Sequence, residues 1–343
     1  MKENENLKSK IRNKPVLSFL ILTFTISWII WTLAPIVTGT GGIDQTEKSS
    51  GDIIVLSLIS TIGAFGPSLA SIIVASILNP LPSNASSKKR WTVFMIIFGI
   101  SLSYYSSQLF LTNNFRYQMV LLSISISAIA AYVVSSIYHP KQGVNQLMQS
   151  LKQISAKNVW LWLAFLLPFA AIIFAATIDL GLGGTGLLSF TFDNLILLVI
   201  SYPIVLLFGG PLNEEAGWRG FAVPHLQDRF SPLKTGIIVG LIWTFWHFPL
   251  HLIGFYPGGV VLFPLRFIYN VPLGVVFTWF FNRSKRNLFV CILLHTSVNL
   301  ASGIFGATSQ LFSYIIIIGF TIAVVFSDKM FKKTKNLQPI QND

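Results

Sequence analysis

The sequence predicts an all-α fold, a polytopic transmembrane helical bundle of about 8–10 spans with both termini in the cytoplasm. Hydrophobic residues make up 53% of the 343 residues and charged residues only 10%, whereas soluble domains carry about 25% charge. The mean hydropathy is +0.67. The apolar residues also form long runs, and basic residues are concentrated in the segments between them.

The apolar runs supply the predicted spans in order. A helix needs roughly 20 apolar residues to cross about 30 Å of hydrocarbon. Ten runs meet or approach this length, near residues 15–37, 53–78, 91–111, 119–138, 159–178, 194–212, 236–255, 261–281, 288–305 and 311–327. Some runs in the second half are short or broken and can be re-entrant or tilted, so a bundle of eight spans also fits.

The basic residues indicate the orientation of these spans. With the N-terminus in the cytoplasm, 21 of the 24 Lys and Arg residues fall in inside segments, Arg219 and the tail 329–335 among them. The outside loops keep only Lys48 and Arg116, while Arg266 falls within a span. This asymmetry follows the positive-inside rule and places both termini in the cytoplasm. The net charge of +12 therefore needs no nucleic-acid partner, which would require a basic face on a soluble fold.

One segment divides the chain. Within residues 143–158, apolar side chains recur at helical spacing among polar ones, at Val144, Leu147, Met148, Leu151 and Ile154. This pattern predicts an amphipathic linker helix on the surface. The linker separates N-terminal transmembrane helices (1–142) from a C-terminal transmembrane bundle (159–328), which is followed by a basic cytoplasmic tail (329–343).

The C-terminal bundle contains nearly all of the strongly polar side chains available to the interior. Glu214 and Glu215 follow a long apolar run, and His247 and His295 lie inside two others. Asn299 follows His295 by four residues and shares its helical face. An ionisable group at membrane depth is costly unless it is paired or hydrated, so its default interpretation is a functional site. These five side chains from three spans predict one site.

Three motifs in this region resemble those of a known family. E-E-x-x-x-R is present as Glu214 to Arg219, and H-x-x-x-N as His295 to Asn299. F-x-x-x-H is present with tryptophan in its first position, Trp243, a change that keeps a large aromatic residue. In this order and apolar context, the motifs resemble the CAAX-protease and bacteriocin-processing (CPBP, or Abi) family of intramembrane glutamic endopeptidases. The resemblance covers roughly residues 195–305.

The two adjacent acids suit different tasks. Peptide hydrolysis needs an activated water, a proton shuttle and donors for the oxyanion. A carboxylate in apolar surroundings is a stronger base than in water, and Glu214 fits that role. Glu215 and Arg219 are four residues apart on a helix, a spacing that allows an ion pair. Such a pair leaves Glu214 free to act on water.

The resemblance implies the same division of roles. It implies that Glu214 and His247 prepare the water and that His295 and Asn299 donate hydrogen bonds to the oxyanion, without a cofactor. Structural interpretations stay open beside it. The pair of Glu215 with Arg219 can support the site rather than react, His247 can be a core histidine, and Asn299 can join helices.

A zinc site is the chemical alternative. Glu214, His247 and His295 could supply three ligands with an open fourth position, as catalytic zinc sites require. His251 follows His247 by four residues, but no H-E-x-x-H motif is present. Cys291 is the only cysteine, which excludes a cysteine-based metal site.

The sequence therefore predicts an endopeptidase that hydrolyses a peptide bond in a membrane-associated protein or precursor peptide. The expected partners are this substrate and the lipid bilayer, with no nucleic acid; the sequence indicates no oligomeric state. The richness in Lys, Asn and Ile favours a bacterial plasma membrane, and with it peptide maturation or bacteriocin immunity. A non-catalytic membrane binding or immunity protein is one alternative. A transporter is another, although the ionisable residues cluster in one half only.

Overall fold

The computed structural model describes residues 2–38, 49–111, 116–184, 192–256, 258–305 and 310–333. Over these residues every regular element is a helix, and the only extended pairing is an isolated bridge between Pro82 and Lys141. Eight helical segments in this part of the chain are long and apolar enough to cross a membrane, and two shorter apolar helices accompany them. The predicted fold class and range of spans are confirmed, while the cytoplasmic position of the termini stays a prediction.

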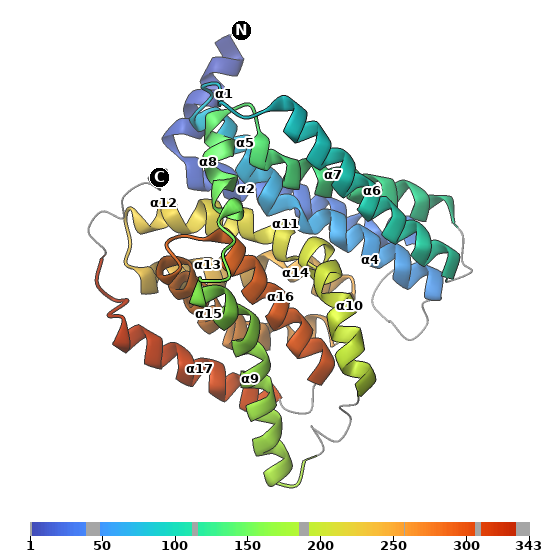
Figure 1. Cartoon of the computed structure of the whole chain (residues 1–343), viewed down its shortest axis with the longest axis vertical. Coiled ribbons are helices and arrows are strands. Elements are labelled where there is room, and N and C mark those ends of the chain that lie inside the picture. Colours follow the sequence, from blue (N-terminus) through green and yellow to red (C-terminus); the bar gives the residue numbers. More distant parts are fainter. Residues whose placement is uncertain are drawn as a thin grey trace.

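The helices form two halves, which Figure 1 shows as an upper and a lower group with α11 and α12 between them. The first half contains α1 (Lys2–Asn13), α2 (Pro15–Thr32), α3 (Ala34–Thr38), α4 (Ser50–Ala64), α5 (Gly66–Leu78), α6 (Ser87–Leu111), α7 (Tyr117–Ser135) and α8 (Gln142–Gln149). The second contains α9 (Val159–Gly181), α10 (Phe192–Phe208), α11 (Pro211–Glu215), a π-helical turn (Ala216–Ala222), α12 (Val223–Gln227), α13 (Pro232–Trp246), α14 (Phe248–Leu252), α15 (Gly259–Arg283), α16 (Leu288–Phe305) and α17 (Gln310–Ser327).

The amphipathic segment between the halves packs on protein. Its helix α8 buries Val144 and Met148 completely. A methyl group on Gly143 would lie 2.2 Å from the carbonyl oxygen of Ala75 in α5, so the two helices touch at their backbones. The apolar face that predicted a surface-lying helix is therefore turned toward α5.

Aromatic side chains of α2 hold the second half in place. Phe19 meets Trp218 of the π-helical turn edge to face, with ring centroids 5.5 Å apart, and Trp31 lies 4.6 Å from Trp246 at the end of α13. The indole nitrogen of Trp28 donates to the carbonyl oxygen of Trp246 over 3.0 Å. Aromatic pairs of this kind add about 0.5–1.5 kcal/mol each beyond the area they bury. The N-terminal half is thus packed directly behind the segments that carry the first two motifs.

Small residues bring α13 and α15 into close contact. Gly236 and Gly240 are four residues apart on α13, the small-xxx-small spacing of tightly packed membrane helices. A methyl group on Gly236 would lie 2.6 Å from Cα of Val275, and one on Gly240 would lie 2.9 Å from Cα of Val271. This contact fixes α13, which carries His247 at its end, against α15.

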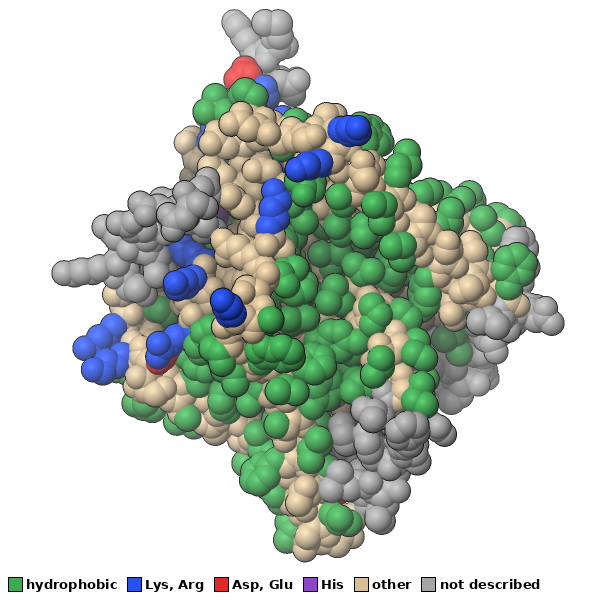
Figure 2. Space-filling view, in the orientation of Figure 1, with side chains coloured by type: hydrophobic (Ala, Val, Ile, Leu, Met, Phe, Trp, Pro, Cys, Tyr) green, Lys and Arg blue, Asp and Glu red, His purple; other side chains and the backbone are tan. Residues whose placement is uncertain are grey.

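The surface has the distribution that the sequence predicts for a bundle in a membrane. Figure 2 shows hydrophobic side chains across the middle of this face and Lys and Arg side chains along its upper-left edge, beside α1 and α8. The predicted position of one basic residue is wrong. Arg219, counted in an inside loop, is fully buried within the candidate span Ile196–Gln227. The apolar run predicted at 194–212 continues as the span Ile196–Gln227, because the charge of Arg219 is paired with buried Glu215.

Gly217 offers a test of the packing between the halves. A methyl group there would lie 2.5 Å from the carbonyl oxygen of Pro67 in α5, so we expect Gly217→Ala to destabilise the protein by roughly 1–3 kcal/mol through overpacking. Thermal unfolding of the purified protein in detergent measures this. Gly319→Ala is the matched control, because nothing lies within 4 Å of its added methyl group. Equal melting temperatures for the two variants would contradict the described contact.

Candidate active site

A break in an apolar span opens the site. The helix α10 ends at Phe208, and Gly210 then adopts a φ of 108°, a backbone conformation that favours glycine. The chain restarts as α11, which carries both glutamates. The carbonyl oxygen of Gly209 accepts a hydrogen bond from Nδ2 of Asn299 over 3.0 Å. Irregular backbone at membrane depth is tolerated where protein encloses it, and here Asn299 satisfies the carbonyl next to the turn.

Glu214 lies on the side of α11 that faces this turn. Its side chain is 5% exposed, and its Oε2 accepts a hydrogen bond from Nε1 of Trp243 over 2.6 Å. A methyl group on Gly210 would lie 2.7 Å from Oε1 of Glu214 and 3.9 Å from Nδ2 of Asn299. The carboxylate oxygen and the amide nitrogen therefore lie no more than about 6.6 Å apart, on either side of the space that glycine leaves empty.

Glu215 is turned the other way and is fully buried. Its Oε1 accepts hydrogen bonds from Nη1 of Arg219 and from Nδ1 of His295, each over 2.8 Å. The Arg219 guanidinium, also fully buried, lies 3.9 Å from the ring centroid of Phe277. This arrangement joins α11, the π-helical turn and α16 around one carboxylate. The predicted pair of Glu215 with Arg219 is present, and His295 is its third member.

The rings of His247 and His295 are held in the same way, each through its Nδ1 atom. Nδ1 of His247 lies 2.8 Å from the carbonyl oxygen of Trp243. A carbonyl only accepts hydrogen bonds, so Nδ1 carries the proton and Nε2 of the neutral ring is an acceptor. Nδ1 of His295 faces the Glu215 carboxylate in the same way. Each ring is thus held through Nδ1, which leaves its Nε2 for chemistry.

Trp243 is the residue that sequence reasoning missed. Besides its hydrogen bond to Glu214, its ring centroid lies 5.7 Å from that of His247 and 5.5 Å from that of His295. The Arg219 guanidinium carbon lies 4.9 Å from the same ring. The replacement of phenylalanine by tryptophan in the second motif was the available signal, because only tryptophan offers an N–H to the acid.

The zinc alternative requires three ligand side chains around one ion. No group of three or more His, Cys, Asp or Glu side chains in the described ranges is arranged to hold one metal ion. The carboxylate of Glu214 and the rings of His247 and His295 each lie against Trp243. No step below is therefore routed through zinc.

A second group lies beyond His247. Nε2 of His251 accepts a hydrogen bond from Nη1 of Arg266 over 3.0 Å, and the Arg266 guanidinium carbon lies 3.9 Å from the Tyr256 ring centroid. Two further histidines have local structural contacts. His225 binds the carbonyl oxygen of Phe221, and burial lowers the pKa of His139 to about 4.

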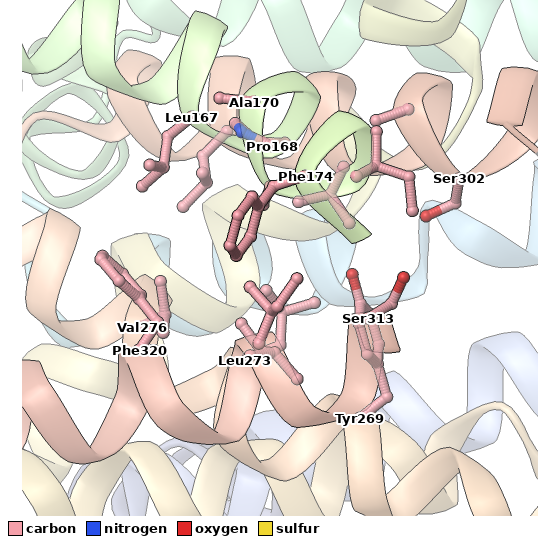
Figure 3. Close-up of a pocket in the computed structure, with 17 residues that line it drawn as sticks. Leu167, Pro168, Ala170, Phe174, Tyr269, Leu273, Val276, Ser302, Ser313 and Phe320 are labelled. Carbon is pink, nitrogen blue, oxygen red and sulfur yellow. The ribbon is translucent and has the colours of Figure 1, made fainter. Parts of the chain in front are cut away.

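An apolar cavity of about 300 Å³ lies behind α16 and is lined by α9, α15, α16 and α17. Leu294 and Val298 line it from the helix that carries His295. In Figure 3, Leu167, Pro168 and Phe174 of α9 face Leu273 of α15 across the cavity. Its size and apolar lining suit a hydrocarbon chain.

A bundle of apolar helices that gathers a carboxylate and two imidazoles around one buried indole, with an amide across the turn at Gly210, has the groups of a membrane-embedded hydrolase. Comparison with known proteins gives two matches. Residues 196–301 match the profile of the family described as Type II CAAX prenyl endopeptidase Rce1-like. The chain is also 26% identical over 238 residues to CAAX prenyl protease 2 of Methanococcus maripaludis, a match that covers 63% of this chain and 85% of that protein. The predicted resemblance to CAAX proteases is confirmed, and both matches support a CAAX-type endopeptidase.

The Trp243 hydrogen bond can be tested by one substitution. Trp243→Phe keeps an aromatic ring but removes the N–H that holds Glu214, and a hydrogen bond to a charged group is worth about 1.5–3 kcal/mol. We expect peptide cleavage to slow by roughly 10- to 100-fold. Trp218→Phe is the matched control, because Trp218 is equally buried and its Nε1 has no hydrogen-bond partner among the described residues. Similar rates for both variants would mean that the indole N–H is unimportant.

The Glu215 ion pair predicts a stability effect. Removing one partner of a buried ion pair costs about 3–5 kcal/mol, so we expect Glu215→Gln and Arg219→Ala to unfold at clearly lower temperature than the wild type. Glu5→Gln breaks the exposed pair with Lys8 and serves as control, since exposed pairs contribute about 0–1 kcal/mol. Thermal unfolding in detergent compares the three. Unchanged stability of both site variants would show that the pair does not support the fold.

Proposed function

We propose that this protein is an intramembrane endopeptidase in which Glu214 and His247 activate a water and His295 and Asn299 stabilise the oxyanion. The proposal rests on one observation: the two adjacent glutamates make different contacts. Glu215 is bound by Arg219 and His295, whereas Oε1 of Glu214 faces the turn at Gly210. One acid is thereby committed to structure and the other is available for reaction.

The proposed reaction begins with a water held by Oε1 of Glu214 and Nε2 of His247. Glu214 removes a proton from the water as the oxygen attacks the carbonyl carbon of the scissile bond. The tetrahedral oxyanion accepts hydrogen bonds from Nδ2 of Asn299 and from Nε2–H of His295. This second donor requires a proton on Nε2 of His295, whose Nδ1 faces the Glu215 carboxylate. Glu214 then returns its proton to the leaving nitrogen, and the peptide bond breaks.

We propose a membrane-associated protein or precursor peptide as the substrate. The relative in Methanococcus maripaludis is named a prenyl protease, and the cavity behind α16 offers space for a hydrocarbon chain attached to such a substrate. Peptide maturation or bacteriocin immunity at a bacterial plasma membrane is the physiological role proposed from the sequence. A non-catalytic binding or immunity protein would use the same pocket without turnover.

The activity test is cleavage of membrane-peptide reporters by the purified protein in detergent and in liposomes. We expect Glu214→Gln to abolish turnover while it keeps the wild-type melting temperature, because Glu214 makes no ion pair within the described residues. Asn299→Ala is expected to lose about 10²–10³-fold in rate, as for one oxyanion donor. Full activity of Glu214→Gln would refute the assigned base.

A chelator separates the metal-free reaction from the zinc alternative. We expect activity to persist after prolonged treatment with a strong chelator, with a known zinc protease inactivated in parallel. Loss of activity that zinc restores would instead favour zinc bound by Glu214, His247 and His295.

A further inference from the structure

Tyr202 of α10 binds the helix that carries the third motif. Its hydroxyl donates to the carbonyl oxygen of Leu293 over 3.2 Å and lies 2.9 Å from Oγ of Ser297, both in α16. A phenol has a single O–H, so the Ser297 hydroxyl is the donor in the second contact. The Tyr202 ring also packs on Phe165 of α9, with centroids 5.1 Å apart. One side chain outside the three motifs thus joins α9, α10 and α16.

These contacts lie on the side of α16 that faces away from the site. The two bound residues are one helical turn apart, two positions before and two positions after His295. Two positions turn the direction by about 200°, so Tyr202 contacts the side of α16 nearly opposite the face that His295 shares with Asn299. On that face, the Glu215 carboxylate binds His295. The helix is therefore held from both sides, which fixes the direction in which Asn299 points.

A proline makes this external support important for α10. Pro203 follows Tyr202 directly inside the helix. It has no N–H and its ring displaces the carbonyl four residues earlier, so one internal hydrogen bond is lost and the helix can bend there. The turns after the proline lead to Gly209, whose carbonyl oxygen accepts from Nδ2 of Asn299 over 3.0 Å. A hydrogen bond to α16 next to the bend therefore sets where the end of α10, and with it Gly209, lies.

We propose that Tyr202 is a positioning residue for the oxyanion site, which holds Asn299 in place through α16 on one side and through Gly209 on the other. Its hydroxyl is bound to atoms of α16, so it acts through Asn299 and not on the substrate. A shift of about 1 Å in a catalytic group can cost roughly 100-fold in rate, so a contact behind the site affects the reaction. This inference rests on the proposed peptidase function for the reaction that it supports.

The first test removes each hydroxyl of the contact. Tyr202→Phe keeps the ring and its packing on Phe165, and Ser297→Ala removes the other partner. We expect each variant to lower kcat for membrane-peptide reporters by roughly 10-fold while KM stays within about twofold, because the loss falls on the transition state. Thr296→Val is the matched control. Thr296 is fully buried in the same turn, but its hydroxyl donates within α16, to the carbonyl oxygen of Ile292, so we expect a wild-type kcat.

The second test asks whether Tyr202 acts through Asn299. In the Asn299→Ala background the donor is absent, so we expect Tyr202→Phe to lower kcat by less than about threefold, although it costs roughly 10-fold in the wild type. A role in general stability would give the same factor in both backgrounds. Hydrogen–deuterium exchange of the purified protein in detergent adds a readout without substrate: residues 203–209 should exchange faster in Tyr202→Phe than in the wild type or Thr296→Val.

The outcomes separate this proposal from the proposed function. Cleavage by the wild type with an unchanged kcat in Tyr202→Phe, or with equal losses in the presence and absence of Asn299, would overturn the positioning role and leave the peptidase standing. Absence of cleavage by the wild type would refute the peptidase, and the exchange comparison then decides whether Tyr202 fixes α10. Faster exchange in Tyr202→Phe would support that hold, and equal exchange would overturn it. Melting temperatures show that each variant is folded.

Discussion

Two neighbouring carboxylates inside an apolar span must each find a partner or water, and the structure meets this constraint at Glu215 by sharing one oxygen between Arg219 and His295. This contact ties α11 to α16 and holds the π-helical turn, a type of helical irregularity that often marks functional sites, between them. It also orients the His295 ring through Nδ1. The position of Glu214, one residue earlier and facing Gly210, follows from the fixed position of Glu215. Supporting and reacting roles are thereby divided between adjacent residues of the same type.

The N-terminal half contributes to this arrangement from behind. The α2 rings of Phe19 and Trp31 pack on Trp218 and Trp246, which adjoin Arg219 and His247 in the sequence. The π-helical turn also approaches α5 closely enough to require glycine at Gly217. Catalytic geometry must be held within fractions of an ångström, and rigid packing of the supporting layer supplies this. The first half of the chain is accordingly part of the support for the site, although none of the three motifs lies in it.

The sequence predicted the membrane bundle well because composition and run length follow directly from the hydrocarbon thickness. It also predicted the pair of Glu215 with Arg219 from their spacing of four residues, and it assigned His247 and His295 to one site because ionisable groups are costly in apolar helices. It failed where the answer depends on three-dimensional partners. Arg219 was assigned to a loop because its charge suggested water, yet Glu215 and the face of Phe277 allow full burial. Trp243 was treated as a substitute for phenylalanine because nothing in the spacing shows that its N–H meets Glu214. The roles of the site residues remain predictions.

The central claim is that Glu215, and not Glu214, binds α11 to α16 through His295. A double-mutant cycle measures it, with unfolding free energies in detergent for Glu215→Gln, His295→Ala and the double variant, beside the same cycle for Glu214 and His295. Contacting buried groups couple by about 0.5–3 kcal/mol. The account predicts coupling in this range for Glu215 with His295 and a much smaller value for Glu214 with His295. Equal coupling in the two cycles, or none for Glu215, would contradict it.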